Sequence, residues 1–425
     1  MDTISIILLA IFINAIIAIA FEHTLGINKS WIAIFTGTTM WMIVAMNLSK
    51  STIHQDLVEG SAEIFELIVF LIGAMTIVEM MAHFRFFRWL EFRLSRLNIS
   101  NTQLFWLLGL ITFISSSLLD NLTTTLVMLQ IGRRLYLREE NFNIFVINTV
   151  IAANAGGAMS PVGDVTTIMI WLAEKFTAWQ ILLWGIFPSL AAWVVPQFLL
   201  TRQIVKENRV GRNSEEVLPL QWNIILLGFM TFGFAVVVNL LHLPPFFGIL
   251  FGLGTAAIVI DYRMKRGKLK KSSNKIVNVI KTIDMSTIIF FVGILLAVNA
   301  LNVYGILDQI SGLLFGSDPG SNGNAIVIGH SLLGLISAIF DNVPLTAGVI
   351  DMLPGDIHYQ YWVLLAITAG TGGSLLVIGS AAGVAAMGQV PTLTVNYYIK
   401  KGTIPALLGY VLAIGTWYLQ WIVFV

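Results

Sequence analysis

The sequence predicts an all-α polytopic membrane protein whose two halves form an inverted-topology repeat, with two re-entrant hairpins and two unwound transmembrane helices. Three observations support this fold class. The 425 residues are 57% hydrophobic and 11% charged, whereas about a quarter of the residues of a soluble domain are charged. Apolar runs long enough to span a bilayer recur along the chain. An Asp-Asn pair and a Gly-Gly pair each occur once in each half.

Ten apolar runs are predicted to cross the membrane: 3–21, 30–49, 61–82, 143–174, 177–201, 221–241, 245–261, 284–302, 358–390 and 403–425. Two further apolar stretches, 101–132 and 325–350, carry the Asp-Asn pairs in their middles, and we expect each to turn back there as a re-entrant hairpin. All of the 24 Lys and Arg residues except Lys50 and Lys175 then fall on one side. The positive-inside rule makes that side cytoplasmic and places both termini outside. The first apolar run is interpreted as a retained helix rather than a signal peptide.

Three matched motifs indicate an internal duplication. The pattern S-x-x-x-D-N-x-x-x-T occurs at 116–125 and again at 337–346, and the pattern GG-x5-G begins at Gly156 and at Gly372. The apolar segment 70–79 also aligns with 290–299, so three matches share one order at nearly one spacing. Because each half contains an odd number of crossings, the second copy is inverted relative to the first. We therefore expect a first repeat at 1–203, a cytoplasmic linker at 204–220 and a second repeat at 221–425.

Residues 83–98 alternate aromatic and basic side chains at helical spacing. This pattern predicts an amphipathic helix in the cytoplasmic interface of the membrane. An ordinary polar loop is the alternative.

A glycine-rich segment follows each hairpin and is predicted to interrupt a transmembrane helix. The residues concerned are Gly156, Gly157, Pro161 and Gly163 in the first half, and Gly372, Gly373 and Gly379 in the second. An interrupted helix frees backbone groups, which membranes tolerate only where the backbone is buried in protein or lines a cavity. Paired broken helices are typical of transporters. Close helix packing through small residues is the alternative explanation.

The hairpins and breaks contain many oxygen-bearing side chains and no Lys or Arg. The candidate ion-binding and proton-coupling residues are Asp120, Asn121, Asp164, Asp341, Asn342, Asn154, Thr125, Thr166, Thr346, Ser116, Ser337 and Ser380, with Thr167 and Ser374 beside them. Oxygen ligands without nitrogen suit a hard cation. The sequence therefore predicts a cation at the Asp/Asn cluster and no cofactor. As an alternative, the Asp-Asn pairs cap the half-helices of the hairpins.

Two acidic residues receive individual predictions. Asp164 has no acidic counterpart, because Ser380 occupies the matching position, and it is our candidate for carrying the proton. Glu79, at the inner end of its span, is a possible proton relay. An ion pair between Glu79 and Arg85 or Arg88 is an equally good interpretation.

Five motifs together resemble the NhaD-type sodium/proton antiporters of the ion transporter superfamily: GAMTIVE (73–79), LLDNLTTTLVM (118–128), IAANAGGAMSPVGDVTTIMIW (151–171), DNVPL (341–345) and AGTGGSLLVIGSAAGVAAMG (369–388). The resemblance runs in order from about residue 61 to 400. It implies a transporter, not an enzyme, that exchanges Na⁺ and also Li⁺ for H⁺. It further implies a multi-pass protein of the bacterial inner membrane and a homodimer with an elevator-like moving domain.

Three rival functions remain open at this point. The first is a Na⁺-coupled anion or dicarboxylate symporter of the same superfamily, which the three aspartates oppose. The second is a passive cation channel, which does not need paired broken helices. The third is an intramembrane aspartyl protease, because Gly163-Asp164 matches part of a Gly-x-Gly-Asp motif whose first glycine is absent here. The net charge of +1 gives no sign of a nucleic-acid partner.

Overall fold

The computed structural model describes residues 2–48, 50–205, 220–266, 276–316 and 322–424, and in these residues it is helical with no strand. The first half contains α1 (Thr3–Ala20), α2 (Glu22–Leu25), α3 (Lys29–Asn47), α4 (Lys50–His83), α5 (Phe86–Ser95), α6 (Asn101–Leu118), α7 (Asn121–Leu135), α8 (Glu139–Ala158), α9 (Val165–Leu172) and α10 (Ala178–Thr201). Most of the predicted linker, residues 206–219, lies outside the described residues.

The second half also contains long, short and broken helices. It contains α11 (Trp222–Leu240), α12 (Phe246–Lys265), α13 (Ile276–Ile280), α14 (Met285–Val303), α15 (Ile306–Phe315), α16 (Gly323–Ile336), α17 (Asn342–Met352), α18 (Tyr359–Gly372), α19 (Ala381–Gln389), α20 (Val395–Tyr398), a π-helical turn (Ile399–Thr403) and α21 (Ile404–Phe424). Among the described residues, seven helices are long and apolar enough to cross a membrane: α1, most of α4, α10, α11, α12, α14 and the continuous stretch Val395–Phe424. The protein is therefore an integral membrane protein.

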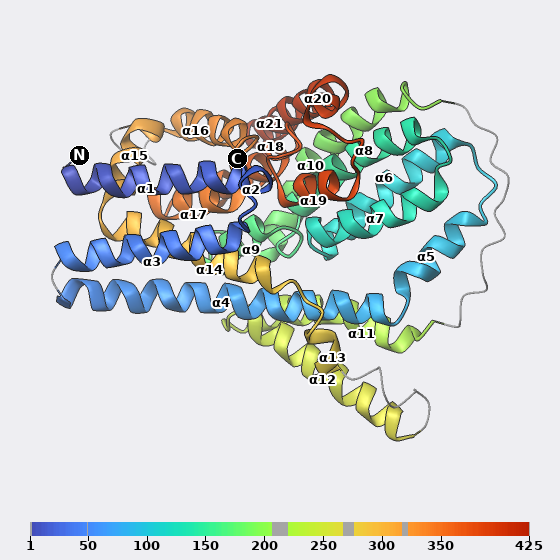
Figure 1. The fold of residues 1–425 in the computed structure, drawn as a ribbon, viewed down its shortest axis with the longest axis horizontal. Helices are drawn as coiled ribbons and strands as arrows, with labels where there is room; N and C mark the ends of the chain where they lie inside the picture. Colours follow the sequence, from blue (N-terminus) through green and yellow to red (C-terminus); the bar gives the residue numbers. More distant parts are fainter. Residues whose placement is uncertain (1, 49, 206–219, 267–275, 317–321, 425) are drawn as a thin grey trace.

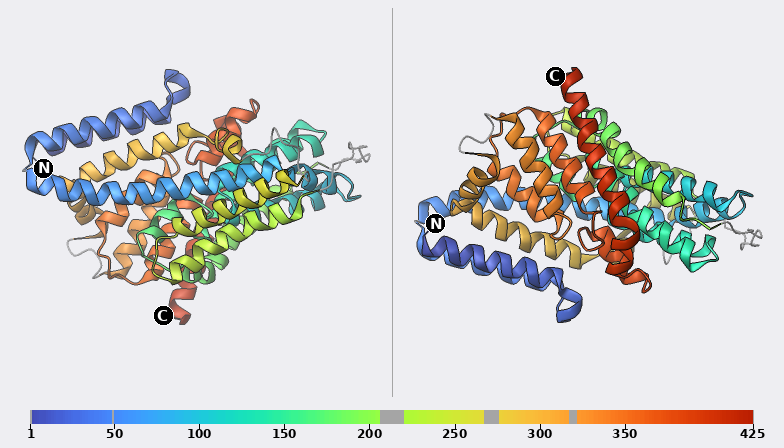
Figure 2. Two further views of the ribbon diagram at one scale, coloured as in Figure 1. Left: turned by 90° about the horizontal axis from the view of Figure 1, so that it is seen from below. Right: turned by 90° about the horizontal axis from the view of Figure 1, so that it is seen from above.

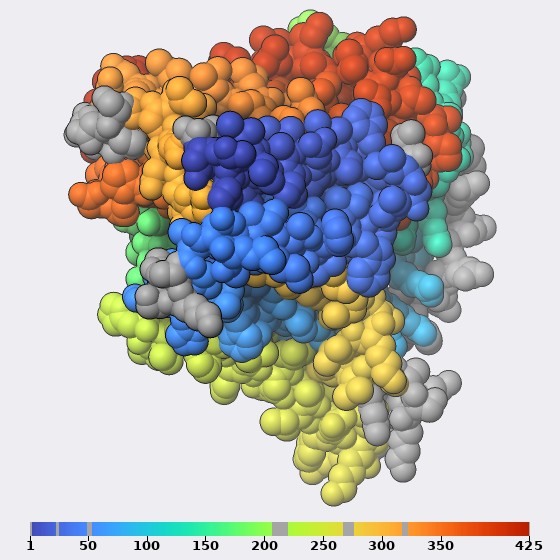
Figure 3. All heavy atoms as spheres, turned by 60° about the vertical axis from the view of Figure 1, so that its left-hand side comes forward, coloured from blue at the N-terminus to red at the C-terminus, as the bar shows by residue number. Residues whose placement is uncertain are grey.

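Long helices of one half pack against helices of the other. α3 lies along α14, α10 lies along α21, and α4 contacts α12 and α14 (Figures 1 and 2). In the space-filling view, α1 and α3 form one continuous face, with α12 extending beyond it (Figure 3). The core of the molecule is thus built jointly by the two halves.

The two Asp-Asn stretches form helix pairs, as the sequence predicts. α6 ends at Leu118 and α7 begins at Asn121, while α16 ends at Ile336 and α17 begins at Asn342. The second helix of each pair runs slightly further than the predicted bounds of 132 and 350. Figure 1 shows α6 and α7 in the right-hand part of the molecule and α16 and α17 in the left-hand part. The two turns therefore approach the middle from opposite ends.

The predicted helix interruptions are also present. α8 and α9 are separated by residues 159–164, and α18 and α19 by residues 373–380. A side chain at Gly156 would collide with the backbone carbonyl of Phe113, and one at Gly372 with that of Gly334. Glycine at these positions allows α8 to pack closely on α6, and α18 on α16.

A short helix follows α4 in the first half and α14 in the second. α5 lies within the predicted amphipathic segment 83–98, but its rings of Phe86 and Trp89 pack on Phe229 and Trp222 of α11. α15 occupies the matching place, and our sequence analysis did not predict it. The residues before them, Arg85 and Gly305, both adopt the left-handed conformation, with φ of 68° and 73°.

Candidate functional site

Asp164 lies at the centre of the molecule, at the first turn of α9. Its backbone is extended, and its side chain caps the helix by accepting a hydrogen bond from the amide of Thr166 (3.4 Å). Thr167 completes a capping box, because its hydroxyl bonds to the backbone of Asp164. The interruption of the helix at 159–164 therefore places a carboxylate at the N-terminus of a half-helix, where the helix dipole favours negative charge.

The asparagines at the turns of both helix pairs, α6/α7 and α16/α17, meet this carboxylate. The Nδ2 atom of Asn121 donates to Oδ2 of Asp164 at 3.1 Å, and Nδ2 of Asn342 donates to the same oxygen at 3.4 Å. Asp164 is 2% exposed, Asn121 5% and Asn342 4%. The two hairpin turns and the first broken helix thus converge on one buried oxygen atom.

Asn154 of α8 extends the network to the second broken helix. Its Oδ1 accepts from Asn121 (3.1 Å), and its Nδ2 donates to the hydroxyls of Ser374 and Ser380, each at 2.9 Å. Asn154 has no exposed surface. Ser380 itself caps α19, as Asp164 caps α9.

Three threonine hydroxyls near this centre are buried and have no hydrogen-bond partner among the described residues. They belong to Thr125 of α7, Thr346 of α17 and Thr166 of α9. An unpaired buried hydroxyl is costly unless a further ligand completes it. These oxygens are therefore available to a bound cation or water.

The predicted hairpin aspartates lie one residue before the asparagines and cap their helices. Oδ1 of Asp120 accepts from the amide of Thr123 at 2.7 Å, and Oδ1 of Asp341 accepts from that of Val343 at 3.0 Å. Both are partly exposed and neither is hydrogen-bonded to Asp164, although both carboxylates interact with it electrostatically. The hydrogen bonds of Asp120 and Asp341 are thus those of helix caps. Their carboxylates nevertheless remain near enough to interact with Asp164.

The remaining predicted residues support the backbone of this region. The hydroxyl of Ser116 donates to the carbonyl of Ala153 (2.6 Å), and that of Ser337 donates to the carbonyl of Ala369 (3.0 Å). Gly157 and Gly373 lie against the carbonyls of Gly163 and Gly379, where a side chain would not fit. Pro161 is buried in the first break.

The centre offers one directly shared carboxylate rather than three. Within the described residues, no group of three or more His, Asp or Glu side chains is close enough to hold a metal ion. The hydrogen-bond partners of Asp164 and Asn154 at this centre are asparagine, serine and threonine groups, and none is Lys or Arg. A single carboxylate with the unpaired hydroxyls of Thr125, Thr166 and Thr346 offers fewer charged ligands than a tightly bound divalent cation takes.

Glu79 lies in α4 and is partly buried. The ion pairs of the described residues are Arg133–Glu139 and Arg134–Glu91, so Glu79 pairs with neither Arg85 nor Arg88 there. Its carboxylate interacts electrostatically with Asp120. Glu79, the possible proton relay, therefore has Asp120 as a neighbouring carboxylate, but no hydrogen bond joins the two side chains.

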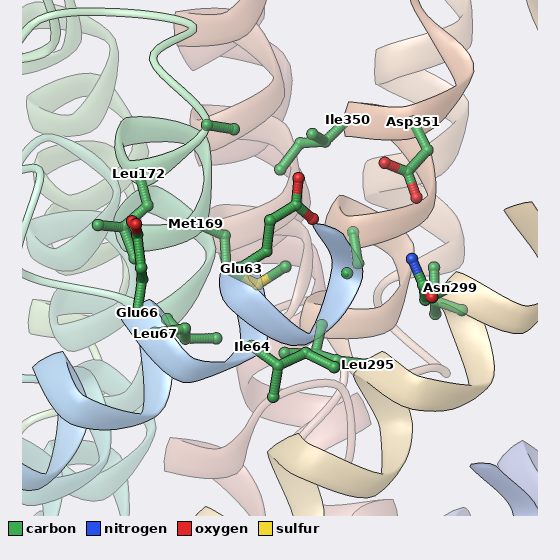
Figure 4. A pocket seen from close by; sticks show the side chains of 14 residues that line it. Glu63, Ile64, Glu66, Leu67, Met169, Leu172, Leu295, Asn299, Ile350 and Asp351 are labelled. Atoms are coloured by element: carbon green, nitrogen blue, oxygen red, sulfur yellow. The ribbon is translucent and has the colours of Figure 1, made fainter. Parts of the chain in front are cut away.

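Two cavities flank the centre. One, of about 110 Å³, lies between α4, α9, α14 and α17, where Glu63 reaches towards Asp351 and Asn299 (Figure 4). Met169 and Ala347, which also line it, follow the central Thr166 and Thr346 closely in sequence. Our sequence analysis gave Glu63 and Asp351 no role and did not predict that they line one cavity, because they are far apart in the chain.

The second cavity, of about 50 Å³, reaches the centre directly. Asp341 and Ser380 line it, together with Glu22 and Lys29 near the start of α3. The Nζ atom of Lys29 lies 4.5 Å from the ring centroid of Phe290, which lines the same cavity. The cavity on the side of Lys29 therefore includes residues of the centre in a mostly apolar lining, whereas the cavity of Glu63 is lined by Met169 and Ala347, which lie near the centre in sequence.

Comparison with known proteins places this arrangement in a family. Residues 11–372 match the family model described as citrate transporter. Sodium/proton antiporter 1 of Arabidopsis thaliana is 36% identical over 413 residues, covering 94% of this chain and 69% of that protein. The Na(+)/H(+) antiporter NhaD of Vibrio parahaemolyticus is 32% identical over 409 residues, covering 89% and 94%. NhaD of Alkalimonas amylolytica is 30% identical over 441 residues, covering 96% and 89%.

The chain belongs to the NhaD-type sodium/proton antiporters. Its named relatives are transporters, in agreement with an all-helical membrane protein. Four of the five motifs that predicted this NhaD-type membership lie at the helix pairs and breaks described above, and the fifth, GAMTIVE, lies in α4. In this NhaD-type chain, Asp164 and Asn154 occupy the first break and its flanking helix, and Ser380 the second break.

Proposed function

We propose that this protein exchanges Na⁺, and also Li⁺, for H⁺ by alternating access, with cation and proton competing for the central aspartates. One observation carries the proposal: Asp164 is bound at once by the asparagines of both hairpins, at the start of a broken helix. The names of the relatives support Na⁺ and H⁺ as the exchanged ions, and Li⁺ is proposed on the superfamily resemblance.

The chemistry of the centre favours a cation over an anion. Asp164 supplies negative charge, and the hydroxyls of Thr125, Thr166 and Thr346 supply oxygen atoms without competing protein partners. An anionic substrate would require Arg, Lys or several free amide donors. The nearest lysine among the cavity residues, Lys29, lies at the mouth of the second cavity rather than at the centre.

Alternating access would expose the centre to one cavity at a time. In this conformation Asp341 and Ser380 line the cavity on the side of Lys29, whereas the residues that line the cavity of Glu63 include neither of them, nor Asp164. The positive-inside rule assigns the side of Lys29 to the cytoplasm. The conformation is then inward-facing, with Na⁺ arriving from the cytoplasm and H⁺ from outside in turn.

The proposed architecture is an inverted repeat with two re-entrant hairpins, ten crossings and both termini outside. The matched contacts of Ser116 with Ala153 and of Ser337 with Ala369 support the repeat, because equivalent residues bond equivalent carbonyls. We place the protein in the bacterial inner membrane as a homodimer with an elevator-like moving domain, on the basis of the superfamily resemblance. Cross-linking in membranes tests the dimer.

The decisive experiment measures proton flux in proteoliposomes or everted vesicles after addition of Na⁺, Li⁺ or K⁺. Alkalinisation of the vesicle lumen with Na⁺ and Li⁺ but not K⁺ is expected for everted vesicles. Current without proton movement would instead indicate a channel. The description of the matching family model makes citrate a second candidate substrate. Na⁺-driven uptake of labelled citrate without proton exchange would replace our proposal by that function.

A further inference from the structure

The two halves contribute unequally to the polar centre. Two positions that carry large polar side chains in the first half, Asn154 and Asp164, correspond at a spacing of 216 residues to Gly370 and Ser380 in the second. One position is reversed, because Ala158 corresponds to Ser374. The first half therefore supplies the amide and the carboxylate, and the second supplies two hydroxyls and a glycine.

The side-chain amide of Asn154 uses both of its N–H groups in hydrogen bonds and also orients the side-chain amide of Asn121. Its own two N–H groups bond Ser374 and Ser380, and its carbonyl oxygen takes one N–H of Asn121. Asn121 then has one N–H left, which it donates to Asp164. An amide has only two N–H groups, so the orientation of Asn121 is fully determined by these partners.

Gly370 of α18 lies close to both Ala158 of α8 and the carboxylate of Asp164. A methyl group at Gly370 would lie 3.6 Å from Oδ2 of Asp164 and 3.0 Å from the Cβ atom of Ala158. The second of these distances is tighter than ordinary contact, so α18 or α8 would have to shift. A glycine opposite Asn154 is thus part of the same arrangement.

We infer that Asn154 is a positioning residue that holds the amide of Asn121 against Asp164 and links both to the second broken helix through Ser374 and Ser380. Gly370 is its complement, kept small so that α18 packs closely on Ala158 of α8 beside the carboxylate. The inference rests on the proposed function, because it assumes that Asp164 takes part in exchange. It adds a physical connection through which a change at Asp164 reaches the opposite half of the protein.

The first test compares two asparagines of one helix. Asn148, like Asn154, is completely buried in α8 and donates to another side chain, Oε1 of Gln197, at 2.9 Å. Asn154→Ala should raise the KM for Na⁺ in proton-flux assays by about tenfold, the equivalent of losing one or two hydrogen bonds. Asn148→Ala should leave KM within about twofold of the parent. Equal effects of the two variants on KM would overturn the inference.

A second test asks whether Asn154 acts through the serines. The double variant Ser374→Ala/Ser380→Ala removes the acceptors and leaves Asn154 in place. The inference predicts that adding Asn154→Ala to this double variant raises KM less than it does in the parent, because two of the three partners of Asn154 are already gone and only Asn121 remains. Fully additive effects would contradict it. These serine variants also serve if Asn154→Ala does not fold, as judged by gel filtration.

Gly370 provides an independent test of the inference. Gly370→Ala should raise KM for Na⁺, whereas Gly388→Ala in α19, which meets nothing within 4 Å, should not. A parent protein without Na⁺-dependent proton flux would refute the proposed function itself. A parent with flux, but with no difference between Gly370→Ala and Gly388→Ala or between the two asparagine variants, would refute only this inference.

Discussion

The two helix breaks, at 159–164 and 373–380, share a backbone arrangement but differ in charge. In both, a residue with φ near −145° caps the following helix, and a glycine of the preceding helix lies against a carbonyl of the break. The caps themselves differ, because Asp164 carries a carboxylate and Ser380 only a hydroxyl. Small residues therefore maintain the architecture in both halves, whereas a few positions determine the chemistry.

The difference also has an electrostatic reason. A carboxylate at both breaks would place two like charges in a buried region already influenced by Asp120 and Asp341. One acidic break and one neutral break avoid this repulsion. The comparison predicts that charge matters at the first break and at both hairpins, and that hydrogen-bonding geometry matters equally in the two halves.

The largest effect is expected at the hairpin aspartates. Asp120→Asn and Asp341→Asn should each abolish Na⁺-dependent proton exchange in vesicles. Asparagine caps a helix about as well as aspartate, so both variants should fold and insert with nearly the parental melting temperature. Asp284→Asn is the matched control, because Asp284 caps α14 through Ser286 and Thr287 outside the centre. If either variant exchanged ions at the parental rate, the aspartate concerned would act only as a helix cap.

Asp164→Asn should separate binding from coupling. The variant keeps an oxygen for Na⁺ and a cap for α9, but it cannot titrate. We expect thermal stabilisation by Na⁺ to persist in part, while proton movement driven by Na⁺ is lost. The matching change Ser380→Asn removes no charge, so its exchange, although slower, should remain coupled to protons. Complete loss of Na⁺ binding in Asp164→Asn would make Asp164 a primary ligand, and proton flux at the parental rate would remove it from the proton path.

Shared use of the carboxylates predicts a dependence on pH. Na⁺ and H⁺ exclude one another at a common carboxylate, so the apparent affinity for Na⁺ should strengthen as the pH rises. Proton flux at a series of Na⁺ concentrations, repeated at several pH values, gives this affinity. An affinity that stays constant with pH would require separate paths for the ion and the proton.

The smallest effects should be equal in the two halves. Ser116→Ala and Ser337→Ala each remove one buried hydrogen bond to a helix carbonyl, a loss of about 1 kcal/mol of stability. Melting temperatures of the purified variants should fall by similar amounts. Thr416→Ala is the control, because its hydroxyl bonds only to Leu412 of its own exposed helix. A large difference between Ser116→Ala and Ser337→Ala would weaken the proposed repeat.

Much of the fold follows from the sequence because its determinants are local. The helix pairs at the Asp-Asn motifs and the breaks at Gly156-Gly157 and Gly372-Gly373 are where they were predicted, within a few residues. Chain length between apolar runs, and the inability of these segments to continue a helix, set those positions. α15 was missed because its ten residues carry few charges and resemble the end of a span.

The identity of the central contacts depends on the tertiary structure. The sequence alone determined the polytopic class, the two broken helices and the set of oxygen-bearing residues from which the site is built. It did not determine that the two asparagines, rather than Asp120 and Asp341, contact Asp164. That choice is made where α7 and α17 begin, because a capping aspartate must turn back to its own helix and the next residue then faces the centre. Which side chains meet across 178 to 226 residues of chain is decided by how the helices pack.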